Sequence, residues 1–295
     1  QSAAVTVAMT LGDKQLISKE VKDDYSISGA SHVLALSGLH LGIIYAIFLF
    51  GFNLCKGIPY LNLLVRYHLS DLFVLLFIWL YALLVDFSPS VVRSATMITV
   101  YSVVGLLNRD KFSLNTLALT AIILLVVRPQ NLWDVGFQMS FVAVLSIVLF
   151  APLLYGLFSP KLLQRHWLLR WVWGLATVSV AAQLGTAPLV AFYFGRFSYY
   201  FLLSNFIVVP CATAILYAAV LLLVFFFIPQ VQLLVGKALL FVVGSMNAAL
   251  HWVAHLQGAS IEGLHPNVLQ VLLWYVFLFC VWYLFSFFSK RTNLE

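Results

Sequence analysis

The chain contains 295 residues, of which 63% are hydrophobic and only 9% charged, with a mean hydropathy of +1.03. A soluble protein needs a polar surface, so this composition excludes a soluble globular domain and predicts an all-α, polytopic helical membrane bundle. The net charge of +6 is compatible with an anionic partner, and the basic cytoplasmic loops of an inner-membrane protein also explain it.

The chain opens with a segment of about 30 residues that we expect on the outer side of the membrane. Residues 1–12 are too short to cross a bilayer, which needs about 20 apolar residues. Further on, Ile17, Val21 and Tyr25 recur at helical spacing among charged residues. This pattern predicts a short amphipathic helix on the membrane surface, and a solvated linker is the alternative.

Nine apolar segments of roughly membrane-spanning length follow and predict a transmembrane domain over residues 31–290. They cover residues 31–54, 69–86, 89–107, 113–128, 134–158, 167–194, 199–228, 231–256 and 267–289. Ser88 is placed to cap the third segment, with Pro89 in its first turn. Pro188 and Pro210, inside the sixth and seventh segments, predict broken or re-entrant helices.

Neither end of the chain is a sound basis for reasoning about the fold. The sequence begins with Gln1 and ends in Leu294-Glu295, so we expect residues 291–295 to be a tail that includes vector-derived residues. The three cysteines, at positions 55, 211 and 280, show neither metal-ligand spacing nor a disulfide framework.

Lysine and arginine counts orient the nine segments. If all nine cross the membrane, one side carries six basic residues and the other carries ten, so the second side is predicted to be cytoplasmic. The unusual polar residues then gather in the outer half of the membrane, which predicts the mouth of a polar cavity that opens outward. These residues are His32, Asp86, Arg93, Arg128, Asp134, Gln138, Gln183, Thr186, Ser204, Asn205, His251 and His255.

The first apolar segment carries the densest set of polar groups, in the stretch SHVLALSGLHLGII of residues 31–44. Such groups are costly in lipid and should face protein or water. Gly38 and Gly42 form a small-xxx-small pair that lets another helix approach closely. His32, Ser37 and His40 occupy a different arc, which predicts a cavity lining; the alternative is that carbonyl groups of a bundle satisfy the histidines.

Arginines outnumber carboxylates at the predicted mouth, with Arg93, Arg128 and Arg196 against Asp86 and Asp134. The planar guanidinium group suits phosphate, and basic grooves with interleaved aromatic rings hold single-stranded nucleic acid. The aromatic residues near the mouth equally fit an interfacial belt. Asp134 is expected to cap the fifth helix, and it could also pair with Arg93.

Two further constellations were weighed for enzymatic or metal chemistry. His251 and His255 share a helix face, but the nearest carboxylate in the sequence is Glu262, so we expect a polar pair at a helix end and no metal site. Ser37 and His40 weakly suggest an intramembrane serine protease, although a serine and histidine three apart on one helix do not usually form a nucleophile–base pair. We expect no enzymatic activity and no cofactor.

Three stretches resemble motifs of the ComEC family, the DNA-uptake channels of competent bacteria. HVLALSGLHLG (residues 32–42) resembles the HLLAISGLHVG motif of that family, and SPSVVRSATM (88–97) and RPQNLWDVGFQMSFVAVLS (128–146) follow in the same order. The match covers nearly the whole chain but only the membrane competence domain of the family. Its oligonucleotide-binding-like and metallo-β-lactamase-like domains are not visible in this sequence.

The resemblance implies a channel that passes single-stranded DNA across the bacterial inner membrane during natural transformation. The implied partners are single-stranded DNA, the lipid bilayer, a cytoplasmic ATP-dependent DNA translocase and a periplasmic DNA receptor. A secondary transporter of a small anionic solute is the alternative, since broken helices and an outward cavity fit it too. The expected pore-lining residues are His32, Ser37, His40, Arg93, Asp134 and Gln138 from the matched motifs, together with Gln183 and Asn205 from the predicted polar mouth; the expected helix-packing glycines are Gly38, Gly42 and Gly136.

Overall fold

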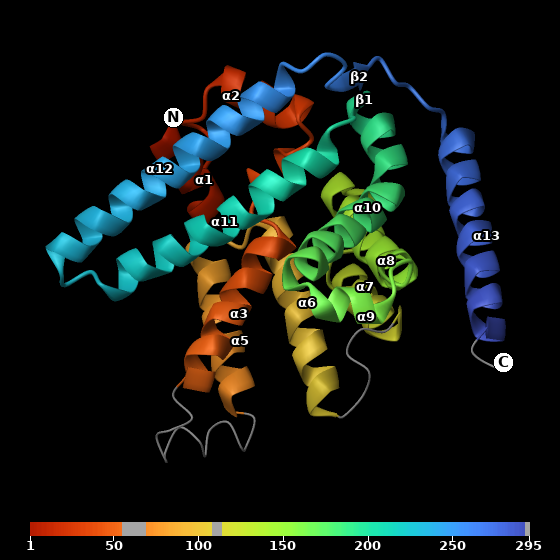
Figure 1. Cartoon of the computed structure of the whole chain (residues 1–295). Coiled ribbons are helices and arrows are strands. Elements are labelled where there is room, and N and C mark those ends of the chain that lie inside the picture. Colours follow the sequence, from red (N-terminus) through yellow and green to blue (C-terminus); the bar gives the residue numbers. More distant parts are fainter. Residues whose placement is uncertain (55–68, 108–113, 293–295) are drawn as a thin grey trace.

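The computed structural model describes residues 1–54, 69–107 and 114–292, and it is almost entirely helical (Figure 1). The helices are α1 (Ser2–Leu11), α2 (Lys19–Ile27), η1 (Ser31–Val33), α3 (Gly38–Leu54), α5 (Leu69–Leu84), α6 (Pro89–Leu106), α7 (Leu114–Val127), η3 (Pro129–Trp133), α8 (Val135–Tyr155), α9 (Pro160–Arg165), α10 (Trp167–Phe194), α11 (Phe201–Val224), α12 (Pro229–Ala254) and α13 (Val268–Thr292). The strands are β1 (Arg196–Ser198) and β2 (Ser260–Glu262). The predicted all-α class is confirmed.

Five of these helices are long and apolar enough to cross a membrane: α8, α10, α11, α12 and the part of α13 over Val268–Phe287. The apolar stretches of α3, α5 and α7 are shorter, so the predicted count of nine spanning segments is not confirmed. Large apolar side chains lie on the outside, as on Phe227 of the α11–α12 turn, which is 86% exposed. A surface of this kind suits lipid, and the chain is an all-α helical membrane protein.

The prediction of broken helices was wrong. Pro188 lies inside the continuous helix α10, and Pro210 lies inside the continuous helix α11. A proline removes one backbone hydrogen bond and disturbs one turn, which a helix packed among neighbours can accommodate. The predicted start of α6 at Pro89 is confirmed, but the Ser88 hydroxyl lies 3.2 Å from that of Ser90 and makes no capping bond to the backbone.

The N-terminal segment is packed into the helical core. Val5 and Met9 of α1 are fully buried and share one apolar cluster with residues of α11 and α12. The predicted amphipathic helix exists as α2, which begins at the capping residue Ser18. Its Tyr25 is buried against α12, where the phenol donates a 2.6 Å hydrogen bond to Asn247 Oδ1. Residues 1–30 therefore belong to the same packed body as α11 and α12, and their location at a membrane surface stays a prediction.

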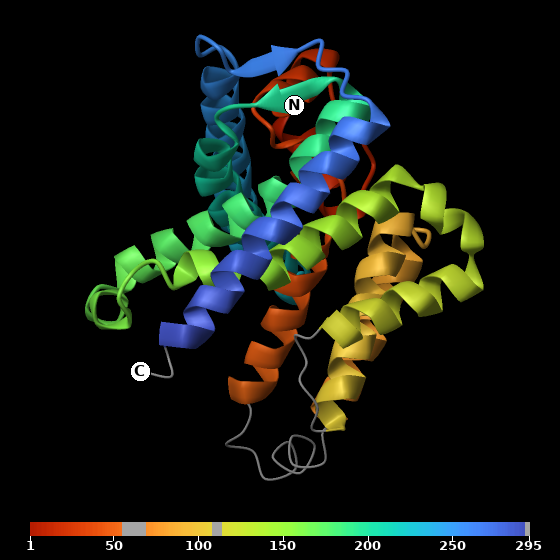
Figure 2. The same cartoon turned by 90° about the vertical axis from the view of Figure 1, so that its right-hand side faces the viewer.

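Two other apolar clusters complete the packing. Helices α3, α5 and α6 run side by side around Leu41, Ile78 and Ala95, while the α11–α12 hairpin crosses them obliquely (Figure 1). On the other side, α13 packs against α8 and α10 through Phe150 and Leu278 (Figure 2). The chain thus forms three helical layers rather than a simple parallel bundle.

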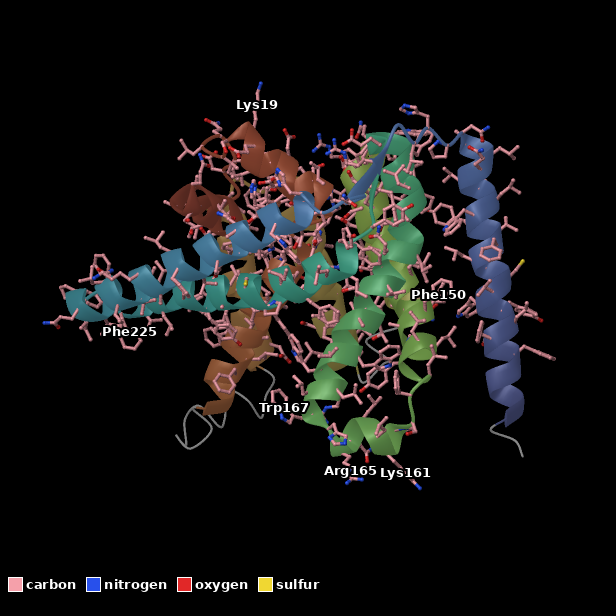
Figure 3. The ribbon with its side chains drawn as sticks, turned by 45° about the horizontal axis from the view of Figure 1, so that its top comes forward. Lys19, Phe150, Lys161, Arg165, Trp167 and Phe225 are labelled. Atoms are coloured by element: carbon pink, nitrogen blue, oxygen red, sulfur yellow. The ribbon has the colours of Figure 1, made fainter. Side chains whose placement is uncertain are left out.

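One end of the molecule is marked by the antiparallel ribbon of β1 and β2, in which Arg196 pairs with Glu262 and Ser198 with Ser260. We call this the ribbon end; it also carries α2, η1 and the start of α13 (Figure 1). Lys19 lies at this end, whereas Lys161 and Arg165 lie at the opposite end (Figure 3). This division agrees with the sides to which the charge counts assign these three residues.

Helices α8 and α10 form the most extensive helix pair, and a glycine makes their close approach possible. A Cβ atom at Gly185 would overlap the Ser146 side chain of α8 and lie 3.1 Å from Val142 Cγ1. The Gly185 carbonyl also accepts a 2.9 Å hydrogen bond from the Tyr275 hydroxyl of α13. Gly185 therefore contributes to the spacing of α10 from both α8 and α13.

We predict that Gly185→Ala lowers the free energy of unfolding by about 1–3 kcal/mol, because the added methyl group overpacks the α8–α10 interface. Gly174→Ala on the same helix is the matched control, since nothing lies within 4 Å of its Cβ position. It should be neutral or stabilising by up to about 1 kcal/mol. Thermal unfolding in detergent measures both, and Ser146→Gly should rescue Gly185→Ala. Equal midpoints for Gly185→Ala and the wild type would refute this packing.

Candidate functional site

The strongest polar feature of the structure joins α6 to α8. Arg93, on α6, is 8% exposed, and its Nη1 lies 2.9 Å from Oδ1 of Asp134. The same oxygen accepts a 2.6 Å hydrogen bond from the backbone N–H of Phe137, so Asp134 also caps α8. Both roles predicted for Asp134 are confirmed. The carboxylate side chain is 46% exposed, so the pair is buried on its arginine side and open on the other.

The three glycines predicted to permit helix contact have different surroundings. At Gly136 a Cβ would lie 2.7 Å from Arg93 Nη2, so this glycine makes room for the guanidinium group rather than for a helix backbone. At Gly38 a Cβ would lie 3.3 Å from Ser94 Oγ, which fits the predicted close approach of α3 and α6. Nothing lies within 4 Å of the Cβ position of Gly42, so the described residues give it no packing partner.

Gln138 lies one turn after Asp134 on α8 and connects two other elements. Its Nε2 donates a 2.9 Å hydrogen bond to the Leu132 carbonyl of η3, and its Oε1 accepts a 2.6 Å bond from the Tyr193 hydroxyl of α10. Gln138 and Asp134 therefore sit on one short stretch of α8 at the ribbon end. Gln183 is partly buried in the middle of α10, and no described contact joins it to Arg93 or Asp134.

Ser37 and His40 meet, contrary to the expectation from their spacing. Ser37 precedes the first residue of α3, so the His40 ring can turn back toward it. Both the Ser37 backbone N–H and its hydroxyl lie within reach of His40 Nδ1, at 3.3 and 2.9 Å. The other nitrogen, Nε2, is buried without a partner among the described residues. In a serine hydrolase, an orienting group binds the histidine nitrogen that does not face the serine. His40 Nε2 has no such partner among the described residues, so the Ser37–His40 contact resembles a helix cap more than a catalytic pair.

His32 lies in η1, next to this contact. Its side chain is accessible to water, yet protein atoms surround it closely enough that desolvation lowers its pKa, against a smaller opposing effect of a hydrogen bond with the Gly29 backbone. The lowered pKa favours the uncharged form of the ring. His32 is also close enough to His40 for charges on the two rings to interact.

Unpaired buried polar atoms gather on three helices in the described part of the chain. They include His40 Nε2 on α3, Arg93 Nε on α6, and Ser204 Oγ and Asn205 Oδ1 on α11. Helix α3 contacts both α6 and α11, so the three helices that carry these atoms are neighbours. Buried polar groups almost always have hydrogen-bonding partners. The region between α3, α6 and α11 is therefore suited to a polar guest or to water.

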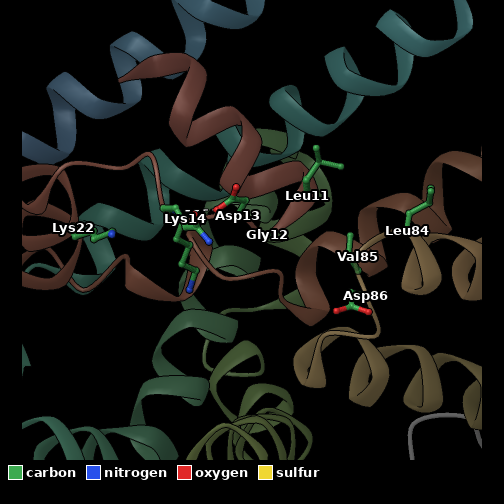
Figure 4. Close-up of a pocket in the computed structure, with 9 residues that line it drawn as sticks. Leu11, Gly12, Asp13, Lys14, Lys22, Leu84, Val85 and Asp86 are labelled. Carbon is green, nitrogen blue, oxygen red and sulfur yellow. Dashed lines mark hydrogen bonds between the residues drawn. The ribbon is translucent and has the colours of Figure 1, made fainter.

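Two cavities open elsewhere at the ribbon end. The first, of about 600 Å³, lies between the α1–α2 loop and the α5–α6 turn, with Lys14, Lys22 and Asp86 in its lining (Figure 4). Partial burial and, to a smaller extent, the charge of Lys22 lower the pKa of Lys14. The second, of about 570 Å³, is mainly apolar and lies between α10 and α13. His32, Arg93 and Gln138 line neither cavity, so the predicted vestibule shared by these three residues is not among them.

One polar contact escaped the sequence analysis altogether. His251 Nδ1 lies 2.9 Å from Oδ2 of Asp24, a residue of α2 that is 227 positions away in the chain. Glu262, the carboxylate nearest to the two histidines in the sequence, instead pairs with Arg196 across the ribbon. No local pattern relates Asp24 to the end of α12, so no sequence signal could have found this contact.

The fold and this polar end define an all-α membrane protein with a half-buried arginine–carboxylate pair and, among its described residues, buried polar atoms without hydrogen-bonding partners. The family model described as "Competence protein" matches residues 9–288, and the chain belongs to this family. The membership predicted from the three motifs is confirmed.

Curated relatives agree with this assignment. The chain is 32% identical over 214 residues to "ComE operon protein 3" of Bacillus subtilis (strain 168), an alignment that covers 72% of this chain and 25% of that protein. It is 25% identical over 224 residues to "Recombination protein 2" of Haemophilus influenzae, covering 74% of this chain and 28% of that protein. An uncharacterized protein of Aquifex aeolicus is 29% identical over 189 residues, covering 64% and 40% of the two chains. The alignments span between a quarter and two-fifths of these relatives. No solved structure matches the chain.

We predict that Gly136→Ala weakens the Arg93–Asp134 pair, because its methyl group would occupy the space of Arg93 Nη2. The expected loss is about 1–3 kcal/mol in the free energy of unfolding, as for other overpacked sites. Gly42→Ala is the matched control, since the space beside Gly42 is open, and it should cause no loss. Unfolding midpoints in detergent distinguish the two variants. A loss confined to Gly42→Ala would show that the assignments are reversed.

Proposed function

We propose that this chain forms the membrane part of the path by which single-stranded DNA crosses the bacterial inner membrane during natural transformation. Membership in the competence protein family supports the proposal. The relatives with printed names are three to four times longer than the region they share with this chain, so uptake itself is proposed for the whole protein. We assign no catalytic role to any residue of this chain.

The observation that carries the proposal is that, among the described residues, the guanidinium group of Arg93 has only part of its N–H groups hydrogen-bonded. Its Nη1 is held by Asp134, while its Nε is buried without a partner in the described part of the chain. A guanidinium group has five N–H donors in a planar fork that matches phosphate. The carboxylate would fix the guanidinium in place and compete with each passing phosphate. Such competition favours transit over tight binding, which a conducting site needs.

The groups beyond Arg93 are polar but uncharged. Ser204 and Asn205 on α11 and His40 on α3 provide hydroxyl, amide and imidazole groups in the region next to α6. His32 lies before α3, and its lowered pKa favours the uncharged imidazole. Hydrogen-bonding groups without charge reduce the cost of a polyanion in a membrane without trapping it. We propose that the strand passes between α3, α6 and α11.

We infer the orientation from the basic residues, on the sequence-based assumption that all nine apolar segments cross the membrane. The side that then carries ten lysines and arginines includes Lys161 and Arg165, opposite the ribbon end, and we place it in the cytoplasm. DNA would then arrive at the ribbon end from a periplasmic receptor. The chain contains no phosphate-binding loop motif, so the energy would come from a cytoplasmic ATP-dependent translocase. The alternative, a secondary transporter of a small anionic solute, was supported in part by the expectation of broken helices. Because α10 and α11 are continuous, that argument no longer applies.

We predict that Arg93→Ala in the full-length protein abolishes transformation. Removing Arg93 also leaves the Asp134 carboxylate without its ion-pair partner and can destabilise the protein, so the test requires a second variant. Arg93→Ala/Asp134→Asn removes both charges, keeps a side-chain oxygen that can cap α8, and should recover membrane abundance, measured by immunoblot, without recovering uptake of labelled DNA. Arg170→Ala, an exposed arginine of α10 near the opposite end, is the charge control and should transform normally.

Recovery of uptake together with abundance in the double variant would show that the pair only holds α6 against α8. Normal uptake by Arg93→Ala alone would remove Arg93 from the path.

A further inference from the structure

A second polar cluster at the ribbon end is unrelated to the Arg93 site. It consists of Asp24 on α2 and of His251 and His255 at the end of α12. One carboxylate oxygen and one ring nitrogen from each histidine lie within 4.8 Å of one another. The Asp24 side chain is 11% exposed, while those of His251 and His255 are 51% and 64% exposed. The cluster is therefore buried on its carboxylate side and open on its imidazole side.

The buried carboxylate lacks a permanent positive partner. Among the described residues, the ion-pair partners of Asp24 are the two histidines, which carry charge only when protonated. The guanidinium of Arg196 is engaged by Glu262 at 2.6 Å and donates a 3.1 Å hydrogen bond to Ser26. A buried charge without a counterion is unfavourable. A cation held between Asp24 and the two imidazoles would provide one.

We propose that Asp24, His251 and His255 bind a divalent transition-metal ion, zinc above all. Imidazole and carboxylate ligands are those of zinc sites with three protein ligands. Magnesium and calcium prefer oxygen ligands in larger numbers, so they fit this donor set poorly. Water would complete the coordination on the exposed side.

The three ligand groups need only small movements to reach the ligand–ligand distances of a zinc site. Ligands about 2.0–2.1 Å from a tetrahedral zinc ion lie roughly 3.3 Å apart. His251 Nδ1 lies 2.9 Å from Asp24 Oδ2, and His255 Nδ1 lies 4.0 Å from Asp24 Oδ1, so the observed distances bracket this value. The two rings have centroids 4.1 Å apart. His255 is the most exposed of the three, so it can turn toward the ion.

Metal binding would rearrange the ring protons. The His255 Nδ1–H now donates a 2.8 Å hydrogen bond to the His251 carbonyl, and Nδ1 of His251 lies 2.9 Å from Asp24 Oδ2. A ring nitrogen binds a metal only without its proton. A neutral ring that binds through Nδ1 would therefore carry its proton on Nε2, and a doubly protonated ring would release one proton to water. The His255 ring would also give up its bond to the carbonyl or turn its other nitrogen inward.

The site rests on elements that are already fixed to each other. One residue after Asp24, the Tyr25 hydroxyl bonds Asn247, which lies one turn before His251 on α12. The metal would add a second cross-link between α2 and α12. It would therefore stabilise the docking of the N-terminal segment, independently of any role in DNA transfer.

The test uses the whole chain, purified in detergent without a polyhistidine tag and stripped with a chelator. Zinc and magnesium are added in turn, and bound metal per chain and the unfolding midpoint are measured. We expect one zinc ion per chain and a midpoint that rises with zinc but not with magnesium. His255→Gln should bind zinc at least about tenfold more weakly, since even indirect partners of a metal site change affinity by 10–100-fold. His166→Gln, an exposed histidine at the start of α10, should behave as the wild type.

Two results would overturn the proposal: wild-type protein that binds no stoichiometric zinc, or a His255→Gln variant with unchanged affinity. Equal weakening in His166→Gln would show adventitious surface binding and would also overturn it. Because His255 is largely exposed, its substitution should leave the fold intact, and elution volume in gel filtration checks this. Asp24→Asn, which keeps the side-chain shape, provides an independent loss-of-binding variant.

Discussion

A charge inside a helical membrane protein must be neutralised by something that the fold itself supplies, and the Arg93–Asp134 pair meets this requirement economically. The carboxylate belongs to the residue that begins α8, so one oxygen satisfies both a helix N-terminus and a guanidinium group. Gly136 then has to lack a side chain, because the arginine fills that space. The cap of α8 and the absence of a side chain at position 136 are thus both linked to the placement of one positive charge away from lipid.

The same requirement explains the contrast between the two halves of the molecule. The α8–α10–α13 layer is joined by apolar packing and by hydrogen bonds to backbone carbonyls, such as those from Trp274 and Tyr275 to Leu184 and Gly185. Helices α3, α6 and α11 instead carry buried polar atoms that have no hydrogen-bonding partner within residues 1–54, 69–107 and 114–292. A purely structural bundle would resemble the first half throughout. The second half bears the cost of unpaired polar groups, which is typical of a region whose surroundings change during function.

The sequence was sufficient for features that depend on near neighbours in the chain. Apolar segments, the start of α6 at Pro89 and the capping role of Asp134 follow from local patterns, and the three motifs identified the family. It was not sufficient where distant segments meet. The position of Asp24 beside His251, the reason for Gly136 and the packing of α1 among α11 and α12 depend on the tertiary arrangement. Pro188 was misinterpreted because local propensity yields to the packing around a long helix.

The core that contains α1 has a consequence for biosynthesis. Val5 and Met9 are buried against residues such as Val208 and Met246, which the ribosome adds roughly 200 residues later. Until α11 and α12 have entered the membrane, the apolar face of α1 lacks the neighbours that those two helices provide. Contacts of such long sequence separation form late and leave apolar surface exposed in the meantime. Helix α1 should therefore complete its packing only after α12 has been made, and the exposed part of its apolar face would until then be covered by the insertion machinery or by the lipid surface.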